Sequence, residues 1–136
     1  MYLPPESLIL GGNFLKEILS YSHNSLVIKV TDNNWTELET EIAQRAFKIA
    51  NERETKALIQ YASQRASEIK ELEELWQFHD FLSSRRHEIE GKYDYRLSVL
   101  LFVFAELLRD GWVNLDDLTG LEAAKLTKIA ALARMV

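Results

Sequence analysis

The feature that most restricts the fold of this 136-residue chain is a segment without any glycine or proline, residues 13 to 90. Ala, Glu, Gln, Lys and Arg, which are strong helix formers, fill the turns that follow Thr36. The order Thr-Glu-Leu-Glu at Thr36 fits a capping box, in which the threonine hydroxyl accepts from the Glu39 N–H and the Glu39 side chain reaches back. The sequence therefore predicts one long helix from near Thr36 to about residue 70.

Apolar residues recur along this helix at steps of three and four, at positions 38, 42, 46 and 49, and then at 58, 62, 66, 69, 72 and 76. A helix over 36–70 would be about 50 Å long, whereas a small domain is about 30 Å across, so the helix must project. A projecting apolar stripe needs a second surface to cover it. We expect a second copy of the chain to supply that surface in a two-fold dimer. The alternative is a helical hairpin within one chain, although no glycine or proline marks its turn.

Residues 71–91 combine aromatic and charged side chains at the highest density in the chain. Six acidic residues against two arginines place −4 of the chain's net charge of −5 in this segment. Such a mixture is typical of interface hot spots, and a core tryptophan with a solvated flank is the plainer alternative. We expect a helix that ends at Gly91 and directs Leu75, Phe78, Leu82 and Ile89 toward a core. The residues that share its other face are Trp76, His79, Asp80 and Ser83, continued by Arg86 and His87.

The last third of the chain predicts a small helical head. Residues 92–109 contain LSVLLFVFAELL, which is apolar almost all round and is typical of a core helix, with a buried strand as the competitor. Asp110 and Gly111 end it, Asn114 caps a short turn over 114–118, and a last helix opens at 119 or 120. The expected fold class is all-α and dimeric, with long stalk helices over 34–91 and a head over 92–136.

The first 33 residues differ from the rest, because they hold both prolines and two of the five glycines. We expect a poorly packed extension or an upstream start, with a short helix over 13–19 and a short strand over 26–30. No basic residue precedes the short apolar stretch at 8–10, as a signal peptide would require. The apolar run 97–108 is interrupted by Ser98 and Glu106 and falls short of the ~20 residues that cross a bilayer. We therefore expect an intracellular protein without an integral membrane span.

The composition and the motifs argue against catalysis, metal binding and nucleic-acid binding. The absence of cysteine excludes disulfides, thiolate metal sites and a cysteine nucleophile. A net charge of −5 and a neutral head disfavour nucleic acid as a partner. His79 and His87 are eight residues apart, too far to share a metal ion as i,i+4 histidines do, and no sequence motif of a catalytic site is present. We expect no enzyme, no catalytic residue, no metal and no cofactor.

The string WQFHDFLSSRRHEIEGKYDYRLSVLLFVFAELL resembles the core of the cyanobacterial fluorescence recovery protein family. The resemblance extends back through WTELETEIAQRAFKIANERE and forward through DGWVNLDDL and LTKIAALARM, covering residues 35 to 135. It implies a non-enzymatic, all-α homodimer with a stalk and a head. Such proteins bind the C-terminal domain of the orange carotenoid protein, the photoreceptor that quenches the phycobilisome antenna. They speed the return of its red form to the orange form and help it leave the antenna, which restores fluorescence after non-photochemical quenching.

The resemblance also implies roles for individual residues. Positions tied to activity and partner binding match Trp76, His79, Asp80 and Arg86 in the stalk and Phe102 and Lys128 in the head. A dimer interface would include Leu72, Leu75, Trp76 and Arg86. The implied location is the cytoplasm near the thylakoid surface, reached through the phycobilisome. Two departures are that residues 1–26 have no counterpart in the shorter family form, and that position 78 is Phe where an aliphatic residue is expected.

Two other functions fit the same residues. A dimeric helical scaffold or transcription co-regulator with another protein partner would present a basic groove. A pigment-binding protein would co-purify with carotenoid.

Overall fold

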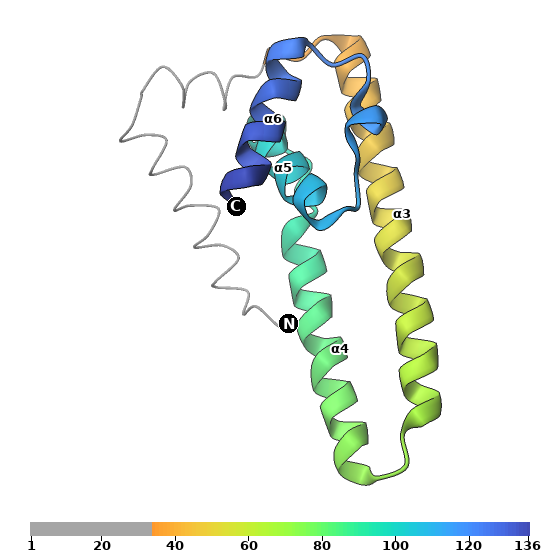
Figure 1. Ribbon diagram of the computed structural model, residues 1–136. Coiled ribbons are helices and arrows are strands. Elements are labelled where there is room, and N and C mark those ends of the chain that lie inside the picture. The colour runs from red at the N-terminus through yellow and green to blue at the C-terminus, as the bar shows by residue number, and fades with distance from the viewer. Residues whose placement is uncertain (1–33) are drawn as a thin grey trace.

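The computed structural model describes residues 34–136, which form helices and turns apart from one isolated bridge between Thr119 and Leu121. The helices α3 and α4 lie side by side, and α5 and α6 gather at one end of them (Figure 1). The predicted all-α class is thereby confirmed. The short helix and strand expected over 13–19 and 26–30 lie outside the described residues. The element order is α3 (Glu37–Glu68), α4 (Leu72–Lys92), the 3-10 helix η1 (Leu97–Val99), α5 (Leu100–Asp110), the 3-10 helix η2 (Leu115–Leu118) and α6 (Ala123–Met135).

Helix α3 is the long helix that the sequence predicts, with 32 residues and a length of about 48 Å at 1.5 Å per residue. The capping box is confirmed: the Glu39 N–H donates to Thr36 Oγ1 at 3.1 Å, and the Thr36 N–H donates to Glu39 Oε1 at 3.2 Å. The first half of α3 enters the hydrophobic core through three fully buried alanines, Ala43, Ala46 and Ala50. Their small side chains let the helix backbone approach its neighbours closely.

Helix α4 folds back along α3, so the chain forms the hairpin that was the alternative to a single projecting helix (Figure 1). Residues 69–71 reverse the chain. Ile69 (φ −70°, ψ 124°) and Glu71 (φ −121°, ψ 152°) are extended, so the turn does not use the left-handed region that favours glycine. The Lys70 N–H donates to Glu74 Oε2 at 3.1 Å and ties the turn to the start of α4. This turn carries no sequence signal because ordinary residues adopt its conformation.

The hairpin leaves much of its apolar surface uncovered. Beyond Glu54, neither α3 nor α4 has a buried residue until Lys92 at the end of α4. Ile59 is 61% exposed and Leu72 is 65% exposed. We call residues 55–91 the arm and the remaining described residues the head. Because two antiparallel helices cover only one side of each other, the arm retains an apolar face that a second surface can cover.

The core of the head is built around α5, which is buried from Leu100 to Ala105. Ile129 and Leu132 of α6 pack into the same core. Gly111 ends α5 as predicted, with a φ of +82°. Asn114 also caps η2 as predicted: its side chain accepts from the Asp117 N–H at 3.0 Å.

Two predicted boundaries around the end of α4 are wrong. The helix continues through Gly91 to Lys92, because Gly91 keeps a negative φ and does not act as a left-handed cap. The apolar helix begins at Leu100 rather than at residue 92. The intervening chain runs beside α3 instead, where the Tyr95 hydroxyl donates to the Thr40 carbonyl at 3.3 Å.

The start of α6 also differs from the prediction, at Ala123 instead of 119 or 120. Gly120 has a φ of +106°, which is incompatible with a helix. A Cβ at this position would meet Ile42 Cδ1 at 2.5 Å, so any other residue would also displace the end of the Ile42 side chain on α3.

A buried ion pair connects the N-terminal end of α3 to α6. Lys125 Nζ lies 3.1 Å from Glu39 Oε1, and the two side chains are 8% and 7% exposed. Lys125 also donates to the Asn34 carbonyl at 2.8 Å, and Glu39 Oε2 accepts from the Glu122 N–H at 2.9 Å. The capping carboxylate of α3 therefore also joins it to the last helix, 86 residues away in sequence.

A second polar contact joins the middle of α3 to η2. Arg53 donates to both carboxylate oxygens of Asp117, at 2.6 and 3.2 Å, and to the Trp112 carbonyl at 3.1 Å. The hydrogen bonds from Arg53, with one from the Asn114 backbone, lower the pKa of Asp117 below its ordinary value of 3.8. Burial alone would raise the pKa of Glu39, but hydrogen bonds from Glu122, Thr36 and Lys125 outweigh it and lower that pKa below 4.5.

These two carboxyl groups predict a loss of stability in acid. Because each has a lower pKa in the folded state than in the unfolded chain, its contribution is complete above the ordinary values of 3.8 and 4.5 and is lost as the pH falls through the folded-state values. We expect the free energy of unfolding in urea to be nearly constant from pH 7 to about 5.5 and to fall below it. Asp117→Asn should reduce the slope of that fall. An identical slope in the variant would contradict the role given to Asp117.

Candidate partner-binding surface

The outer face of α4 presents the predicted aromatic and charged residues together. Trp76 is 55% exposed, and its ring lies edge-on to the ring of His79 with centroids 6.2 Å apart. His79 Nδ1 lies 3.3 Å from Asp80 Oδ1, and both side chains are exposed. An indole, an imidazole and a carboxylate are therefore adjacent and open to solvent, a combination suited to recognition of another protein.

Arg86 continues this face one helical turn beyond Ser83. Its Nε donates to Glu90 Oε1 at 2.9 Å, in a pair that is 79% and 59% exposed. Exposed ion pairs contribute little to stability, so Arg86 can exchange Glu90 for a carboxylate of a partner at small cost. A shallow concavity of about 520 Å³ follows the same stretch of α4 and is lined by His79, Leu82, Ser83, Arg86, His87 and Glu90.

The expectation that one side of α4 faces a core is wrong. Leu75 is 42% exposed, and Phe78, Leu82 and Ile89 are only half-buried. The reason is that α3 covers a single strip of α4, where the Phe81 ring meets the ring of Tyr61 at 5.1 Å. The apolar residues Leu72 and Leu75 consequently lie on the surface beside Trp76, and together they form an exposed patch near the hairpin turn.

The two predicted residues of the head differ in their surroundings. Phe102 lies on α5 and is 7% exposed, as part of the core. Lys128 lies on α6 and is partly exposed. Five of the six predicted positions are therefore accessible to a partner in the described chain, and Phe102 is not.

Sequence reasoning missed the buried polar residues. Glu54 is 3% exposed and Lys92 is 7% exposed, and they pair with each other. A signal was present for Glu54, because it lies four residues after Ala50 on the buried stripe of α3, where a charged residue interrupts the apolar repeat. Lys125 gives a similar signal, four residues before the buried Ile129.

The face on α4 has the geometry of a binding surface rather than a reaction site. The His79 and Asp80 side chains are 70% and 81% exposed, so their contact is open to solvent at the edge of the shallow concavity. Over the described residues, no group of three or more side chains is placed to hold a metal ion. Within the same part of the chain, every helix is too short or too polar to cross a membrane.

Comparison with known proteins assigns the chain to a family. A family profile described as "Photoprotection regulator fluorescence recovery protein" matches residues 35–133. The chain belongs to the fluorescence recovery protein family. A protein of Synechocystis sp. named "Fluorescence recovery protein" is 45% identical over 109 residues, which cover 80% of this chain and 100% of that protein. This family regulates photoprotection and is not known as an enzyme family.

Solved structures of fluorescence recovery proteins share the fold. The protein from Fremyella diplosiphon is 57% identical, with a TM-score of 0.73 over 75% of this chain and 100% of that one. The Synechocystis protein is 49% identical, with a TM-score of 0.71 over 74% of this chain and 98% of that one. The family resemblance of the sequence string around Trp76 is therefore confirmed.

Proposed function

We propose that this chain acts as a homodimer that binds the C-terminal domain of the photoactivated orange carotenoid protein and accelerates its return from the red to the orange form. The same contact promotes its detachment from the phycobilisome and so restores antenna fluorescence. The observation that supports this most strongly is the exposed Trp76, His79 and Asp80 face in a member of a family of photoprotection regulators. Its place of action is the cytoplasm beside the thylakoid, where the antenna lies.

The arm supports the homodimer. Leu72 and Leu75 are exposed beside Trp76. No side chain of the arm is buried, so the arm lacks a hydrophobic core of its own. Two copies that paired these patches across a two-fold axis would cover both at once. Arg86 and Glu90 would lie at the charged border of that interface.

The mechanism requires no change in covalent bonds. A protein accelerates a partner's relaxation when it binds the transition state, or a compact intermediate, more tightly than the separated red form. Trp76 and Arg86 would contact the partner from the border of the dimer interface, Trp76 as an anchor, and Asp80 and Lys128 would help Arg86 to orient it. Phe102 would contribute indirectly, because a buried ring in α5 supports the surface above it rather than contacting a partner.

The direct test is dark recovery of the photoactivated orange carotenoid protein, followed by absorbance with and without the chain. Acceleration at substoichiometric amounts is the expected result, because a regulator that turns over is released after each event. If a folded dimer gives no acceleration, the proposed function is wrong.

Asp80→Ala is expected to reduce the acceleration about tenfold or more, as the truncation of an interface hot spot does. The measurement is the recovery rate as a function of the concentration of the variant. Glu73→Ala is the matched control, because it removes another exposed carboxylate from the same helix. Full activity in a dimeric Asp80→Ala variant would show that Asp80 is not part of the partner-binding surface.

A further inference from the structure

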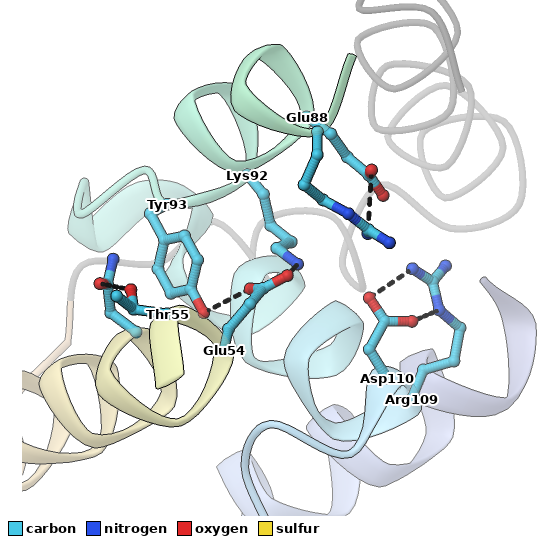
Figure 2. A network of polar contacts seen from close by, with 9 residues as sticks. Glu54, Thr55, Glu88, Lys92, Tyr93, Arg109 and Asp110 are labelled. Carbon is cyan, nitrogen blue, oxygen red and sulfur yellow. Dashed lines mark hydrogen bonds and ion pairs between the residues drawn. The ribbon is translucent and has the colours of Figure 1, made fainter. Parts of the chain in front are cut away.

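Three polar side chains meet inside the molecule at the level where the head joins the arm (Figure 2). Lys92 Nζ donates to Glu54 Oε2 at 2.7 Å, and the Tyr93 hydroxyl donates to Glu54 Oε1 at 2.8 Å. The Lys92 and Glu54 side chains are 5% and 4% exposed. Both oxygens of the carboxylate are thus occupied by donors that follow each other in the chain. We call Glu54, Lys92 and Tyr93 the junction cluster.

The junction cluster lies at the boundary of the hydrophobic packing. On the head side of Glu54, α3 is held by Ile42 and by its buried alanines. On the arm side, no residue from 55 to 91 is buried. Tyr93 adds a ring contact to the head side, because it packs edge-on against Phe47 with centroids 5.3 Å apart. The cluster therefore joins the last anchored turn of α3 to the point where α4 leaves the arm.

Apolar packing does not fill the space beside the cluster. A cavity of about 340 Å³ lies between α3, α4 and the loop that follows α5, and Glu54 forms part of its wall. Ala57, Phe81 and Trp112 line it from the three sides, and none of them is buried. The rings of Tyr61 and Phe81 meet at 5.1 Å on the arm side of this cavity, and α3 itself is continuous, so the open space loosens the restraint on the angle between arm and head rather than removing it.

A buried ion pair is weak evidence for stability, since well-packed apolar residues of similar volume often replace one without loss. What such a pair supplies is a defined geometry, because its hydrogen bonds form only at particular distances and angles between the groups. We propose that Glu54, Lys92 and Tyr93 are positioning residues that hold the arm at a single angle to the head. They thereby keep the α4 face around Asp80 and the α6 surface around Lys128 in one spatial relation. This second statement rests on the proposed function.

The test replaces the whole cluster by apolar residues, Glu54→Met, Lys92→Met and Tyr93→Phe, so that no buried polar group loses its partner. The chain has no cysteine, so Ser63→Cys on the arm and Ala131→Cys on α6 accept spin labels specifically. Labelled chains diluted with unlabelled chains report the distance within one protomer by pulsed electron spin resonance. We expect the triple variant to unfold at an unchanged urea concentration and its distance distribution to be at least about twice as wide as that of the parent.

The control removes an exposed pair from α3, Lys48→Met with Glu52→Met, whose side chains are 79% and 64% exposed. It should leave the distribution unchanged. A triple variant with the parental width would overturn the proposal. If the triple variant does not fold, Tyr93→Phe alone removes one of the two donors to Glu54, and an unchanged width in that variant would overturn it equally.

Recovery of the photoreceptor provides the second readout. If the binding-competent angle falls to about a tenth of the population, the half-saturating concentration rises about tenfold while the rate at saturation stays the same. A loss of rate at saturation with an unchanged half-saturating concentration would contradict positioning. The distance measurement needs no partner, so it decides the role of the cluster even if the parent chain fails to accelerate recovery, which would reject the proposed function alone.

Discussion

Lys125→Met is expected to lower the free energy of unfolding by about 3 kcal/mol, because it leaves the Glu39 carboxylate buried without its cationic partner. Glu39 is 5% exposed and accepts from Lys125 at 3.1 Å. The same substitution removes the hydrogen bond to the Asn34 carbonyl and the cation that lies 5.2 Å from the centre of the Trp35 ring. Urea unfolding at a fixed protein concentration measures the change, which should shift the midpoint by roughly 1–3 M.

Lys128→Met is the matched control for this experiment. It lies one turn further along α6 and is partly exposed, with no ion pair to a buried carboxylate among the described residues. We expect its stability to remain within about 0.5 kcal/mol of the parent, as for most surface substitutions. Equal midpoints for the two variants would contradict the structural role of the Lys125–Glu39 pair. The comparison also separates loss of fold from loss of partner binding on the same helix.

Leu75→Glu is expected to convert the proposed dimer into monomers. A two-fold interface would bring two copies of the substitution together, placing two carboxylates in an apolar seam without partners. Size-exclusion chromatography with light scattering measures the mass directly. The expected result at micromolar concentration is the mass of one chain, 15.8 kDa, with an unchanged helical circular dichroism signal.

Leu115→Glu provides the control for charge and exposure. Leu115 is 46% exposed in η2 of the head, close to the 42% of Leu75 on the arm. The variant should keep the mass of the parent. If Leu75→Glu keeps the dimer as well, Leu75 lies outside the interface and the exposed patch around Trp76 serves another purpose.

Local signals in the sequence predicted local structure well. The capping box at Thr36, the cap at Asn114 and the end of α5 at Gly111 each depend on hydrogen bonds or backbone angles within a few residues. The shared face of Trp76, His79 and Asp80 follows in the same way from helical periodicity. These features could be predicted because no distant part of the chain is needed to form them.

Features that depend on distant residues could not be predicted. The hairpin turn at 69–71 uses ordinary residues in extended conformations, and α6 begins only after a loop in which Gly120 approaches Ile42 of α3. The burial of Phe102 depends on helices that are not adjacent in sequence. The ion pair between Glu39 and Lys125 spans 86 positions, so neither residue alone indicates it. Periodicity assigns a face to each side chain but does not say which neighbour covers that face.

The alanine stripe of α3 also has a consequence for biosynthesis. Ala43, Ala46 and Ala50 share a core with α5, which begins 50 positions after Ala50. At about 5–20 residues per second, a ribosome exposes this stripe for roughly 3–10 seconds before the residues that cover it have been added. Leucine at these positions would expose far more apolar surface to other nascent chains during that interval. Small side chains therefore suit a helix that is translated before the residues that cover it.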